Sequence, residues 1–544
     1  MNYKVLIIIP ARGGSKGIPR KNIRSLNGNP LISYSIRTAL KSKYDPDVYV
    51  TSDDDEILHI ASKIGAKIIK RNTSFARDET TLDPVIYHAY TEAESIECKK
   101  YDVVVSMQPT SPLLKVESLD SAINILMHNT KVDTIISATN DTHLSWNLVN
   151  NKYLPAYKAR VNRQLLEPKF KETGGFLITR SSFVTKGGRI GNNVDLILLE
   201  SGEKIDIDTY EDWSLCEYHL KRKKILFVVS GNTEIGLGHV YNTLLLANDI
   251  LDHDIEFLVD NESQLAYDKI VTQNYKVCMQ RGEDILEDIK RIRPDVIIND
   301  RLDTEESYVK ALKFLGLTVI NFEDLGPGSK IADLVINAIY EYREAISNQY
   351  CGHKYFILRD EFLLEGPKEI VKITSHVLLA FGGVDPSNYT KRVLGVIYEY
   401  CMDRDISIVV VAGRGYQFMS TLKMFKNIVL LQDVKNISEY ILKADIVFTS
   451  AGRTTYEVAS LATPAIVLAQ NKRETTHFFA SREYGFINLG LGGEVKDGQI
   501  LKSFKALSSD YELRRKISNI MIKIQLNSGR KRVVDLIKKV MESV

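Results

Sequence analysis

Cysteine is scarce in this sequence, and long apolar runs are missing. Only five cysteines occur among 544 residues, and no two of them stand in a CxxC spacing. That usage argues against a disulfide framework or a zinc site and is typical of a reducing compartment. The first apolar run, 5–9, is too short for the core of a signal peptide, and no run approaches the length of a membrane span. We therefore expect a cytoplasmic protein without a membrane partner.

A strong charge of one sign is also missing. The formal net charge is +2, so nothing in the composition points to nucleic acid or another strongly acidic partner. With 44% hydrophobic and 26% charged residues, the chain has the composition of a soluble globular protein. Its length predicts three or four domain-sized units.

Short β-branched runs alternate with helix-period segments along the whole chain. In the first part the predicted strands are 3–9, 48–51, 67–70, 103–107 and 134–138, with helices such as 31–41 and 54–63 between them. This alternation predicts βαβ units and therefore an α/β fold with a doubly wound, mainly parallel sheet.

Two restarts of this pattern divide the chain. A charged helix end at 221–224 runs into a new apolar strand, 225–229, as though a second protein began there. A later strand, 376–380, is again followed by a glycine turn. We place domains at 1–221, 222–370 and 371–544. The last two are expected to be Rossmann-like halves that form a cleft, with helices after about residue 505 crossing back between them.

The segment that follows the first predicted strand is rich in glycine and basic residues. Gly13, Gly14 and Gly17 let the backbone pass close to a ligand, and five basic residues fall between Arg12 and Arg24. Ligands bind at this carboxyl end of a strand in open α/β sheets. A triphosphate needs backbone N–H groups and basic side chains around its oxygens. The spacing matches neither a Walker A nor a GxGxxG pattern, and a solvated basic loop is the alternative.

Two aspartates further along the chain suit a metal ion. Asp206 and Asp208 flank Ile207 in a strand-like segment, so both carboxylates are expected on one side. Mg²⁺ binds proteins through one or two carboxylates and completes its shell with phosphate and water, which makes it the expected cofactor. The alternative is an exposed acidic pair at a strand end.

Residues 9–23, IPARGGSKGIPRKNI, resemble the signature of the CMP-sialic acid synthetase (acylneuraminate cytidylyltransferase) family. Further matches follow in family order: Arg71 with Asp78 and Thr80, the QPTSPL turn at 108–113, the Arg163-Gln164 pair, and the Asp206-Ile207-Asp208 segment. The resemblance covers about the first 215 residues. It implies transfer of CMP from CTP to an acidic nine-carbon sugar, with a homodimer as a further expectation.

The same resemblance implies roles for individual residues. The expected nucleotide-binding residues are Ala11, Arg12, Lys16, Lys21, Asn22, Arg71, Thr80 and Gln108. The expected sugar-binding residues are Arg163, Gln164, Gly175 and Phe176, and Phe176 is expected to add apolar surface. Catalysis is assigned to Arg12, Lys21 and Arg163, which offset developing charge. Asp206 and Asp208 are the implied Mg²⁺ ligands.

The sequence departs from this family at two places. Leu82 stands where a serine near the nucleotide is usual, and Thr173-Gly174-Gly175 replaces an Asn-Gly pair. The second change touches the sugar region, so the identity of the nonulosonic acid stays open. Kdo-type cytidylyltransferases share the start of the loop, but Lys21-Asn22 and the two aspartates favour the acylneuraminate branch.

Glycine loops follow strands again in the second part. Gly238 and His239 open a helix after the strand 225–229, where a base facing a cleft belongs. Segments 382–386 and 449–457 follow two later strands, and the second suits a diphosphate at a helix N-terminus. A structural histidine and a helix-capping loop are the alternatives.

These segments together resemble the PseG/SpsG family of nucleotide-sugar hydrolases, relatives of GT-B glycosyltransferases, over about residues 222–500. The resemblance implies a UDP-sugar site in which His239 is catalytic. The residues carried over to that site are Gly238, His239, Asp385, Gly452, Thr454, Glu457 and Asn471. Asn242 replaces an arginine of the family, and Arg301 stands where an aromatic residue is expected. A non-catalytic nucleotide-sugar-binding module and a GT-B glycosyltransferase therefore remain alternatives to a hydrolase.

Overall fold

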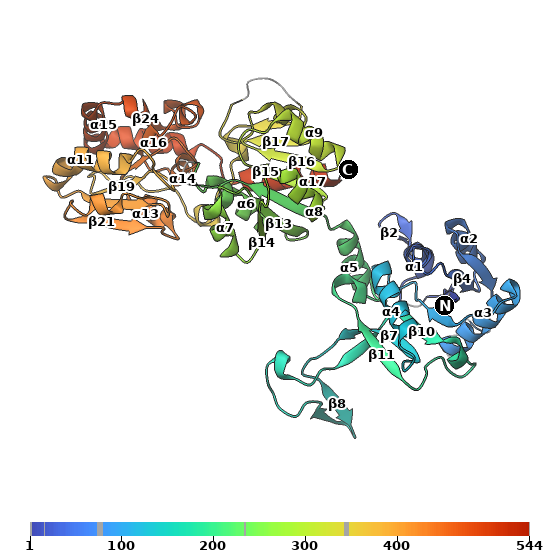
Figure 1. The fold of residues 1–544 in the computed structure, drawn as a ribbon. Coiled ribbons are helices and arrows are strands. Elements are labelled where there is room, and N and C mark those ends of the chain that lie inside the picture. The colour runs from blue at the N-terminus through green and yellow to red at the C-terminus, as the bar shows by residue number, and fades with distance from the viewer. Residues whose placement is uncertain are drawn as a thin grey trace. The chain divides into compact units, whose positions relative to one another are not determined.

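The computed structural model describes residues 3–15, 17–72, 75, 80–232, 235–341 and 347–542. Lys16 and Asp78, two residues expected near the nucleotide, lie outside these ranges. The chain divides into two compact units, Met1–Arg222 and Lys223–Val544, one residue from the expected boundary at 221 (Figure 1). Each unit has its own sheets and its own apolar cores, so each is described by itself.

The first unit is built on a seven-stranded sheet with the order β11-β7-β10-β6-β1-β4-β5. Its strands are β1 (Val5–Pro10), β4 (Asp47–Ser52), β5 (Lys67–Lys70), β6 (Val103–Ser106), β7 (Thr134–Asn140), β10 (Phe170–Arg180) and β11 (Val194–Leu198). All neighbours pair in parallel except β10, which is antiparallel to both β6 and β7. The predicted mainly parallel α/β sheet is thus confirmed.

Helices cover both faces of this sheet. They are α1 (Leu31–Leu40), α2 (Asp55–Ile64), α3 (Leu82–Glu97), α4 (Val116–His128) and α5 (Tyr210–Lys221). β1 is buried along its whole length. Its successive residues Ile7 and Ile8 belong to different apolar cores. A strand with both faces covered reads as a continuous apolar run, which is why the sequence located β1 so well.

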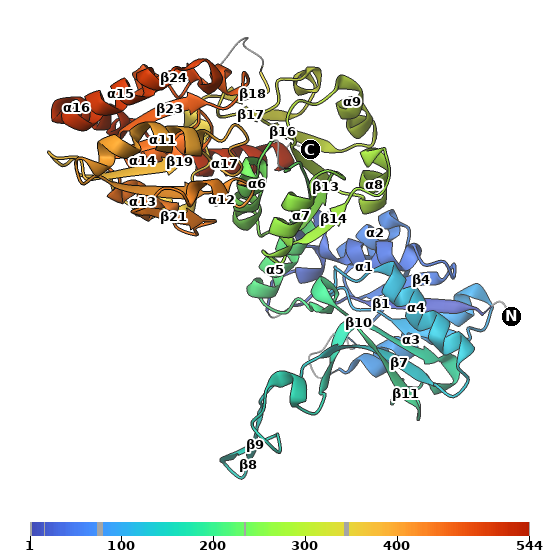
Figure 2. The same cartoon turned by 60° about the vertical axis from the view of Figure 1, so that its left-hand side comes forward.

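One segment leaves this sheet between β7 and β10. It carries the hairpin of β8 (Trp146–Val149) and β9 (Lys152–Pro155), which stands away from the rest of the first unit in both views (Figures 1 and 2). Trp146, Leu148 and Tyr153 are 53%, 61% and 74% exposed. The excursion therefore presents apolar side chains that the unit itself does not bury.

The second unit contains two parallel sheets, as two Rossmann-like halves require. The order in the first half is β14-β13-β12-β15-β16-β17-β18, and in the second half it is β21-β20-β19-β22-β23-β24. The strands of the first half are β12 (Lys224–Val229), β13 (Asp254–Val259), β14 (Lys276–Met279), β15 (Val296–Asp300), β16 (Thr318–Phe322), β17 (Leu334–Asn337) and β18 (Gln349–Cys351). Those of the second half are β19 (His376–Ala380), β20 (Ser407–Ala412), β21 (Ile428–Gln432), β22 (Ile446–Thr449), β23 (Ala465–Ala469) and β24 (Phe486–Leu491).

Helices flank both sheets, and the last of them returns to the first half. The helices are α6 (Gly238–Asp249), α7 (Gln264–Val271), α8 (Ile285–Ile292), α9 (Glu306–Phe314), α10 (Asp360–Leu364), α11 (Tyr389–Met402), α12 (Met419–Leu422), α13 (Ile437–Lys443), α14 (Thr454–Ser460), α15 (Asp497–Ser509), α16 (Tyr511–Ile522) and α17 (Gly529–Glu542). Val533 and Ile537 of α17 join the core that contains Phe227 of the first half. No helix within the described ranges has the length and apolar character needed to cross a lipid bilayer.

Candidate active sites

The glycine-rich loop after β1 is tied back onto itself and onto the acidic segment. Asn22 donates its side-chain amide to the Arg12 carbonyl at 2.9 Å, which closes the loop between β1 and the short helix η1 (Lys21–Ile23). Lys21 Nζ donates to the Ile207 carbonyl and lies 3.2 Å from Asp208 Oδ1. The structure thus brings Arg12, Lys21, Asn22 and Asp208, four of the predicted site residues, into one place.

Three more predicted nucleotide residues lie at the carboxyl ends of neighbouring strands. Ala11 follows β1 and its N–H donates to the Thr51 carbonyl at 3.0 Å. Arg71 follows β5, is 6% exposed and donates to the Ala11 carbonyl at 3.3 Å. Burial lowers the pKa of its guanidinium, whose Nε lacks a hydrogen-bond partner. Gln108 follows β6, and Thr80 lies just before α3. Strand ends of this kind form the ligand edge of an open α/β sheet.

The two aspartates expected to bind Mg²⁺ differ in exposure. Residues 205–208 are coil rather than the expected strand, and the side chain of Asp206 is partly buried whereas that of Asp208 is 76% exposed. Burial raises the pKa of Asp206, an effect that the nearby Thr110 hydroxyl reduces. Asp206 Oδ1 is buried without a hydrogen-bond partner, so it can still accept a ligand bond.

The donor set fits a magnesium ion that binds together with phosphate. Within the described part of the chain, no group of three or more His, Cys, Asp or Glu side chains is arranged to hold a metal. Asp206 and Asp208 offer two carboxylates, and Mg²⁺ commonly takes its remaining ligands from phosphate oxygens and water. This arrangement suits an ion delivered with a nucleotide better than a permanently held one.

The four residues assigned to the sugar separate into two environments. Arg163 and Gln164 lie exposed in the short helix η3 (Arg163–Leu165), on the excursion that contains β8 and β9. Gly175 and Phe176 lie in β10, where Phe176 is 2% exposed and belongs to the main core of the unit. The expectation that Phe176 offers apolar surface to a sugar is therefore wrong, because its ring is used for packing.

The neighbouring glycine is the residue of this segment that faces the acidic pair. A Cβ on Gly174 would lie 2.8 Å from Asp206 Oδ1, whereas a Cβ on Gly175 would meet Ser137 Oγ at 3.0 Å inside the core. Gly174 thus permits close approach of β10 to the expected metal ligand. The unusual glycine pair hints at this close approach, but the sequence does not show which of the two glycines is involved.

A cavity of about 390 Å³ lies in the second unit and is lined by residues of both halves. All seven residues predicted for the UDP-sugar site line it: Gly238, His239, Asp385, Gly452, Thr454, Glu457 and Asn471. These residues come from four separate stretches of sequence, and the fold places all of them around one cavity.

The histidine of the first half is held by a buried carboxylate. His239 Nδ1 lies 2.5 Å from Asp300 Oδ1, and Asn242 Nδ2 donates to the other Asp300 oxygen at 2.9 Å. Asp300 is fully buried at the end of β15. A carboxylate on Nδ1 fixes the imidazole so that its other nitrogen can accept a proton. Asn242, which departs from the family pattern, therefore helps to hold the His239–Asp300 pair by bonding to the second oxygen of Asp300.

Several predicted residues of the second half already have protein partners. Asp385 is 2% exposed and accepts hydrogen bonds from the N–H groups of Tyr389 and Thr390 and from Gln470, so it caps α11. Asn471 Oδ1 accepts from the Glu474 N–H at 3.0 Å. These two side chains shape the loops of the cavity.

Glu457 was expected to accept hydrogen bonds from ribose hydroxyls. Its carboxylate lies 2.8 Å from Arg359 Nη2, and burial raises its pKa while that arginine lowers it in part. The Glu457–Arg359 pair lines the cavity. The Glu457 carboxylate therefore already has Arg359 as a partner, and a ligand at this wall would share it with that arginine.

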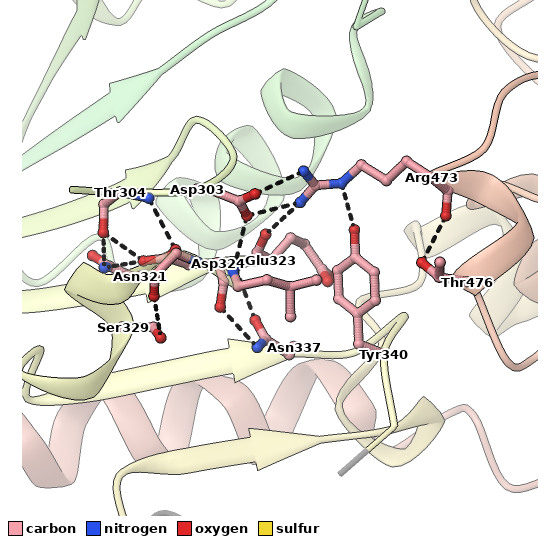
Figure 3. Close-up of polar contacts among 12 residues, drawn as sticks. Asp303, Thr304, Asn321, Glu323, Asp324, Ser329, Asn337, Tyr340, Arg473 and Thr476 are labelled. Carbon is pink, nitrogen blue, oxygen red and sulfur yellow. Dashed lines mark hydrogen bonds and ion pairs between the residues drawn. The ribbon is translucent and has the colours of Figure 1, made fainter. Parts of the chain in front are cut away.

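Sequence reasoning missed the residues that join the two halves. Arg473, from the loop after β23, donates to both oxygens of Asp303 and to the Tyr340 hydroxyl at 2.7 Å (Figure 3). Beside this contact, Glu323 and Arg453 approach each other at 3.7 Å across the cavity. No local motif marks such residues, because the partners are more than a hundred positions apart in the sequence.

The first unit matches a family model and several named proteins. Residues 6–163 match the family model described as cytidylyltransferase. The pseudaminic acid cytidylyltransferase of Campylobacter jejuni is 42% identical over 127 residues, which are 23% of this chain and 54% of that protein. The CMP-N,N'-diacetyllegionaminic acid synthase of Legionella pneumophila is 29% identical over 39% of this chain and 95% of its own length.

Other likenesses cover more of the chain. An uncharacterised protein of Methanocaldococcus jannaschii is 35% identical over 274 residues, 46% of this chain and 56% of that one. The chain thus spans about half the length of several curated relatives that it matches. Among solved structures, Acinetobacter baumannii MurG aligns with 58% of the chain at 14% identity and a TM-score of 0.44. A CMP-2-keto-3-deoxy-manno-octonic acid synthetase aligns with 40% at 15% identity and a TM-score of 0.30.

Proposed function

We propose that this chain transfers CMP from CTP to a nonulosonic acid and releases pyrophosphate. The proposal starts from the first unit, which matches the cytidylyltransferase family model and relatives named for this reaction. The observation that carries the proposal is the contact of Lys21 with Ile207 and Asp208, which joins the basic loop to the acidic pair. A nucleoside triphosphate bound there meets cations, backbone N–H groups and metal ligands together.

The proposed reaction is a displacement at the α-phosphorus of CTP. The anomeric oxygen of the sugar, whose proton passes to solvent water, bonds to this phosphorus while the bond to the pyrophosphate oxygen breaks. Negative charge then grows on the pyrophosphate, and Arg12 and Lys21 oppose it from the loop. When bound, Mg²⁺ supplies further charge neutralisation, with Asp206 and Asp208 as its protein ligands.

Pyrophosphate release tests this proposal directly. The full chain, CTP and Mg²⁺ would be mixed with a panel of nonulosonic acids and with Kdo, and pyrophosphate would be measured over time. We expect release only with nine-carbon acids. Turnover of Kdo in preference to every nonulosonic acid would contradict the substrate class while leaving the reaction type intact.

A second activity is proposed for the cavity of the second unit, namely hydrolysis of a UDP-sugar. The observation that favours it is the buried His239–Asp300 pair at the cavity wall. The ring nitrogen of His239 not bonded to Asp300 is placed to take a proton from water, whose oxygen then bonds to the anomeric carbon as the bond to UDP breaks.

UDP release distinguishes this activity from its alternatives. His239→Asn should lower release from a UDP-sugar by about 10²-fold or more, as for loss of a general base. His376→Asn is the matched control, because His376 lies half exposed at the start of β19 and outside the cavity. Binding without any UDP release would identify a binding module, and release that requires a second sugar or lipid acceptor would identify a glycosyltransferase.

A homodimer is also proposed for the chain. The exposed apolar side chains of the β8–β9 excursion, including Trp146 and Leu148, support it, because apolar surface of this kind is commonly covered by another protein surface. Light scattering of the wild type against Leu148→Glu tests it. The five free cysteines support a reducing, cytoplasmic location for these reactions.

A further inference from the structure

Several buried polar atoms that line the cavity of the second unit have no hydrogen-bond partner. Fifteen side-chain polar atoms of the described residues are buried without a hydrogen-bond partner. Four of them belong to residues that line this one cavity: Glu323 Oε2, Arg453 Nη2, Gln470 Oε1 and His477 Nε2. A buried polar group without a partner costs about 1–3 kcal/mol, so such groups are normally paired. Their gathering here marks a place where a ligand supplies the partners.

Glu323 is fixed by its backbone with its carboxyl at the cavity. Its φ of +50° is left-handed, a conformation that an L-residue keeps only where its surroundings impose it. The Glu323 N–H donates to the Ile336 carbonyl at 3.0 Å, and its own carbonyl accepts from Arg473 at 3.3 Å (Figure 3). The side chain is 2% exposed. Burial raises the pKa of Glu323 to about 7, although Arg453 lowers it in part.

His477 faces the cavity from the other half as a neutral acceptor. Its Nδ1 lies 2.8 Å from the Ala451 carbonyl, and since a carbonyl only accepts, Nδ1 carries the proton. Nε2 is therefore left as a bare acceptor, and it has no partner. Burial lowers the pKa of His477 to about 4, so the ring is uncharged at neutral pH. Its ring packs against Tyr340 at 5.3 Å between centroids.

The chemistry of these atoms distinguishes the parts of a nucleotide sugar. Glu323 Oε2, His477 Nε2 and Gln470 Oε1 all accept hydrogen bonds when Glu323 is ionised, so their ligand must present O–H or N–H groups toward both halves. A phosphate has only acceptor oxygens and cannot satisfy them, but it can pair with Arg453. A hydroxylated or acylamino sugar presents donors in several directions at once.

We infer that Glu323 and His477 form the glycosyl subsite of the cavity and receive hydroxyl or amide hydrogens of the sugar, one residue from each half. The inference rests on the proposed UDP-sugar function and names the part of the substrate that each wall binds. Arg453, at 3.7 Å from Glu323, then lies at the junction between the glycosyl group and the diphosphate.

Calorimetric titration of the full chain tests the inference with two probes, UDP and UDP-N-acetylglucosamine, at pH 7.5. The quantity of interest is the ratio of their dissociation constants, because it isolates what the glycosyl group adds. Glu323→Gln and His477→Phe should each shift this ratio against the sugar by about tenfold, as for a lost hydrogen bond to a buried group. His477→Phe should leave the dissociation constant of UDP within about twofold, since the nucleotide does not reach that side chain. For Glu323→Gln only the ratio is interpreted, because the neighbouring Arg453 also meets the diphosphate.

The control is Glu256→Gln, which removes a buried carboxylate of the same unit that pairs with Lys224 and Lys276 outside the cavity. Its ratio should equal that of the wild type. Retained UDP binding also shows that each variant is folded. An unchanged ratio in both cavity variants, or an equal loss of UDP and UDP-sugar affinity, would overturn the glycosyl subsite. Failure of the wild type to bind UDP would instead overturn the proposed function itself.

Discussion

The two candidate sites hold most of their polar groups in different ways. In the first unit, Lys21, Asn22 and Asp208 bond to one another or to the backbone, and Asp208 remains largely exposed to solvent, although Asp206 Oδ1 and Arg71 Nε are buried without a hydrogen-bond partner. In the second unit, Glu323 and His477 are buried with atoms that have no partner. An open, self-paired site can release its internal contacts to phosphate and metal as they arrive. A closed, unpaired site must obtain its partners from a ligand of matching shape.

This difference also decides what each site can discriminate. Charges at an open loop recognise phosphates, which every nucleotide has, and add little selectivity for the group transferred. Buried acceptors reject a ligand that lacks the matching hydrogens, because no new hydrogen bond then offsets the desolvation cost of these acceptors. We therefore expect catalysis at the first site to depend on a few charges, and binding at the second to depend on neutral hydrogen bonds.

Removal of one acidic charge should have the largest effect. Asp208→Asn should lower CMP transfer on the order of 10³-fold while CTP still binds, because one anionic Mg²⁺ ligand is lost. The measurement is pyrophosphate release across a Mg²⁺ titration, with CTP binding followed separately. Asp195→Asn, at an exposed position of β11, is the control and should match the wild type. An unchanged kcat for Asp208→Asn at limiting Mg²⁺ would exclude Asp208 as a ligand.

Removal of a loop cation should have the next largest effect. Lys21→Ala and Arg12→Ala should each lower kcat/KM by about 10²-fold, since each removes a donor that opposes charge in the transition state. Lys186→Ala, an exposed lysine between β10 and β11, is the control. Steady-state kinetics with CTP as the varied substrate give the comparison. Wild-type values for both variants would show that this loop does not bind the phosphates.

The first site was predictable because its motifs are contiguous and their chemistry is explicit. The loop at 10–22 supplies glycines and cations within one stretch, and strands such as β1 and β6 are clear apolar runs, so strand ends and loop positions follow from the sequence. The sequence did not predict which side chains of β10 are buried in the core. Phe176 and Gly175 lie in the core because β10 is buried on both faces from 174 to 179, and the alternation of strands and helices does not show where a strand enters the sheet.

The second site was only half predictable. His239, Gly452 and Glu457 follow strands in recognisable loops and were found. Glu323, Arg453 and His477 act through partners far along the chain, and nothing local distinguishes them from ordinary charged residues. Asp300 left one signal, an acid at the end of an apolar strand, that could have been paired with His239.

Glu323, whose Oε2 has no hydrogen-bond partner, should also affect the pH dependence of stability. Glu323 has an ordinary pKa of 4.5 and a folded pKa of about 7, so the folded chain holds its proton longer than the unfolded chain does. Stability is therefore lost as pH rises from about 5 to 8, by up to about 3 kcal/mol for this group. Glu323→Gln should remove that loss, as measured by hydrogen exchange of peptides from the second unit.

The matched variant Glu256→Gln should behave in the opposite sense. Burial would raise the pKa of Glu256, but its bonds to Lys276 and Lys224 lower it below the ordinary value. That carboxylate therefore stabilises the fold above the ordinary pKa and loses its contribution as pH falls. Similar pH profiles for the two variants would contradict the contrast between Glu256, which bonds to two lysines, and Glu323, whose Oε2 has no hydrogen-bond partner.

Substrate preference should give a smaller effect that links the two units. If the second unit hydrolyses a UDP-sugar that precedes the sugar acid, the first unit should prefer the acid made from it. Two relatives act, by name, on pseudaminic and diacetyllegionaminic acids. We expect such acids to exceed N-acetylneuraminate by at least about tenfold in kcat/KM, or 1.4 kcal/mol. Equal turnover of N-acetylneuraminate would separate the two activities.

The smallest expected effect concerns independence of the units. The sheets and apolar cores of the first unit contain only residues before 222, and those of the second contain only residues after it. A chain ending at Arg222 should therefore fold and keep kcat within about twofold of the full chain, as expected of a domain with its own core. Circular dichroism and pyrophosphate release measure this. The matched chain, 223–544, should keep its UDP affinity for the same reason. Loss of activity in the shortened chain despite native circular dichroism would show that the second unit affects catalysis at the first site. The two sites would then be coupled rather than independent.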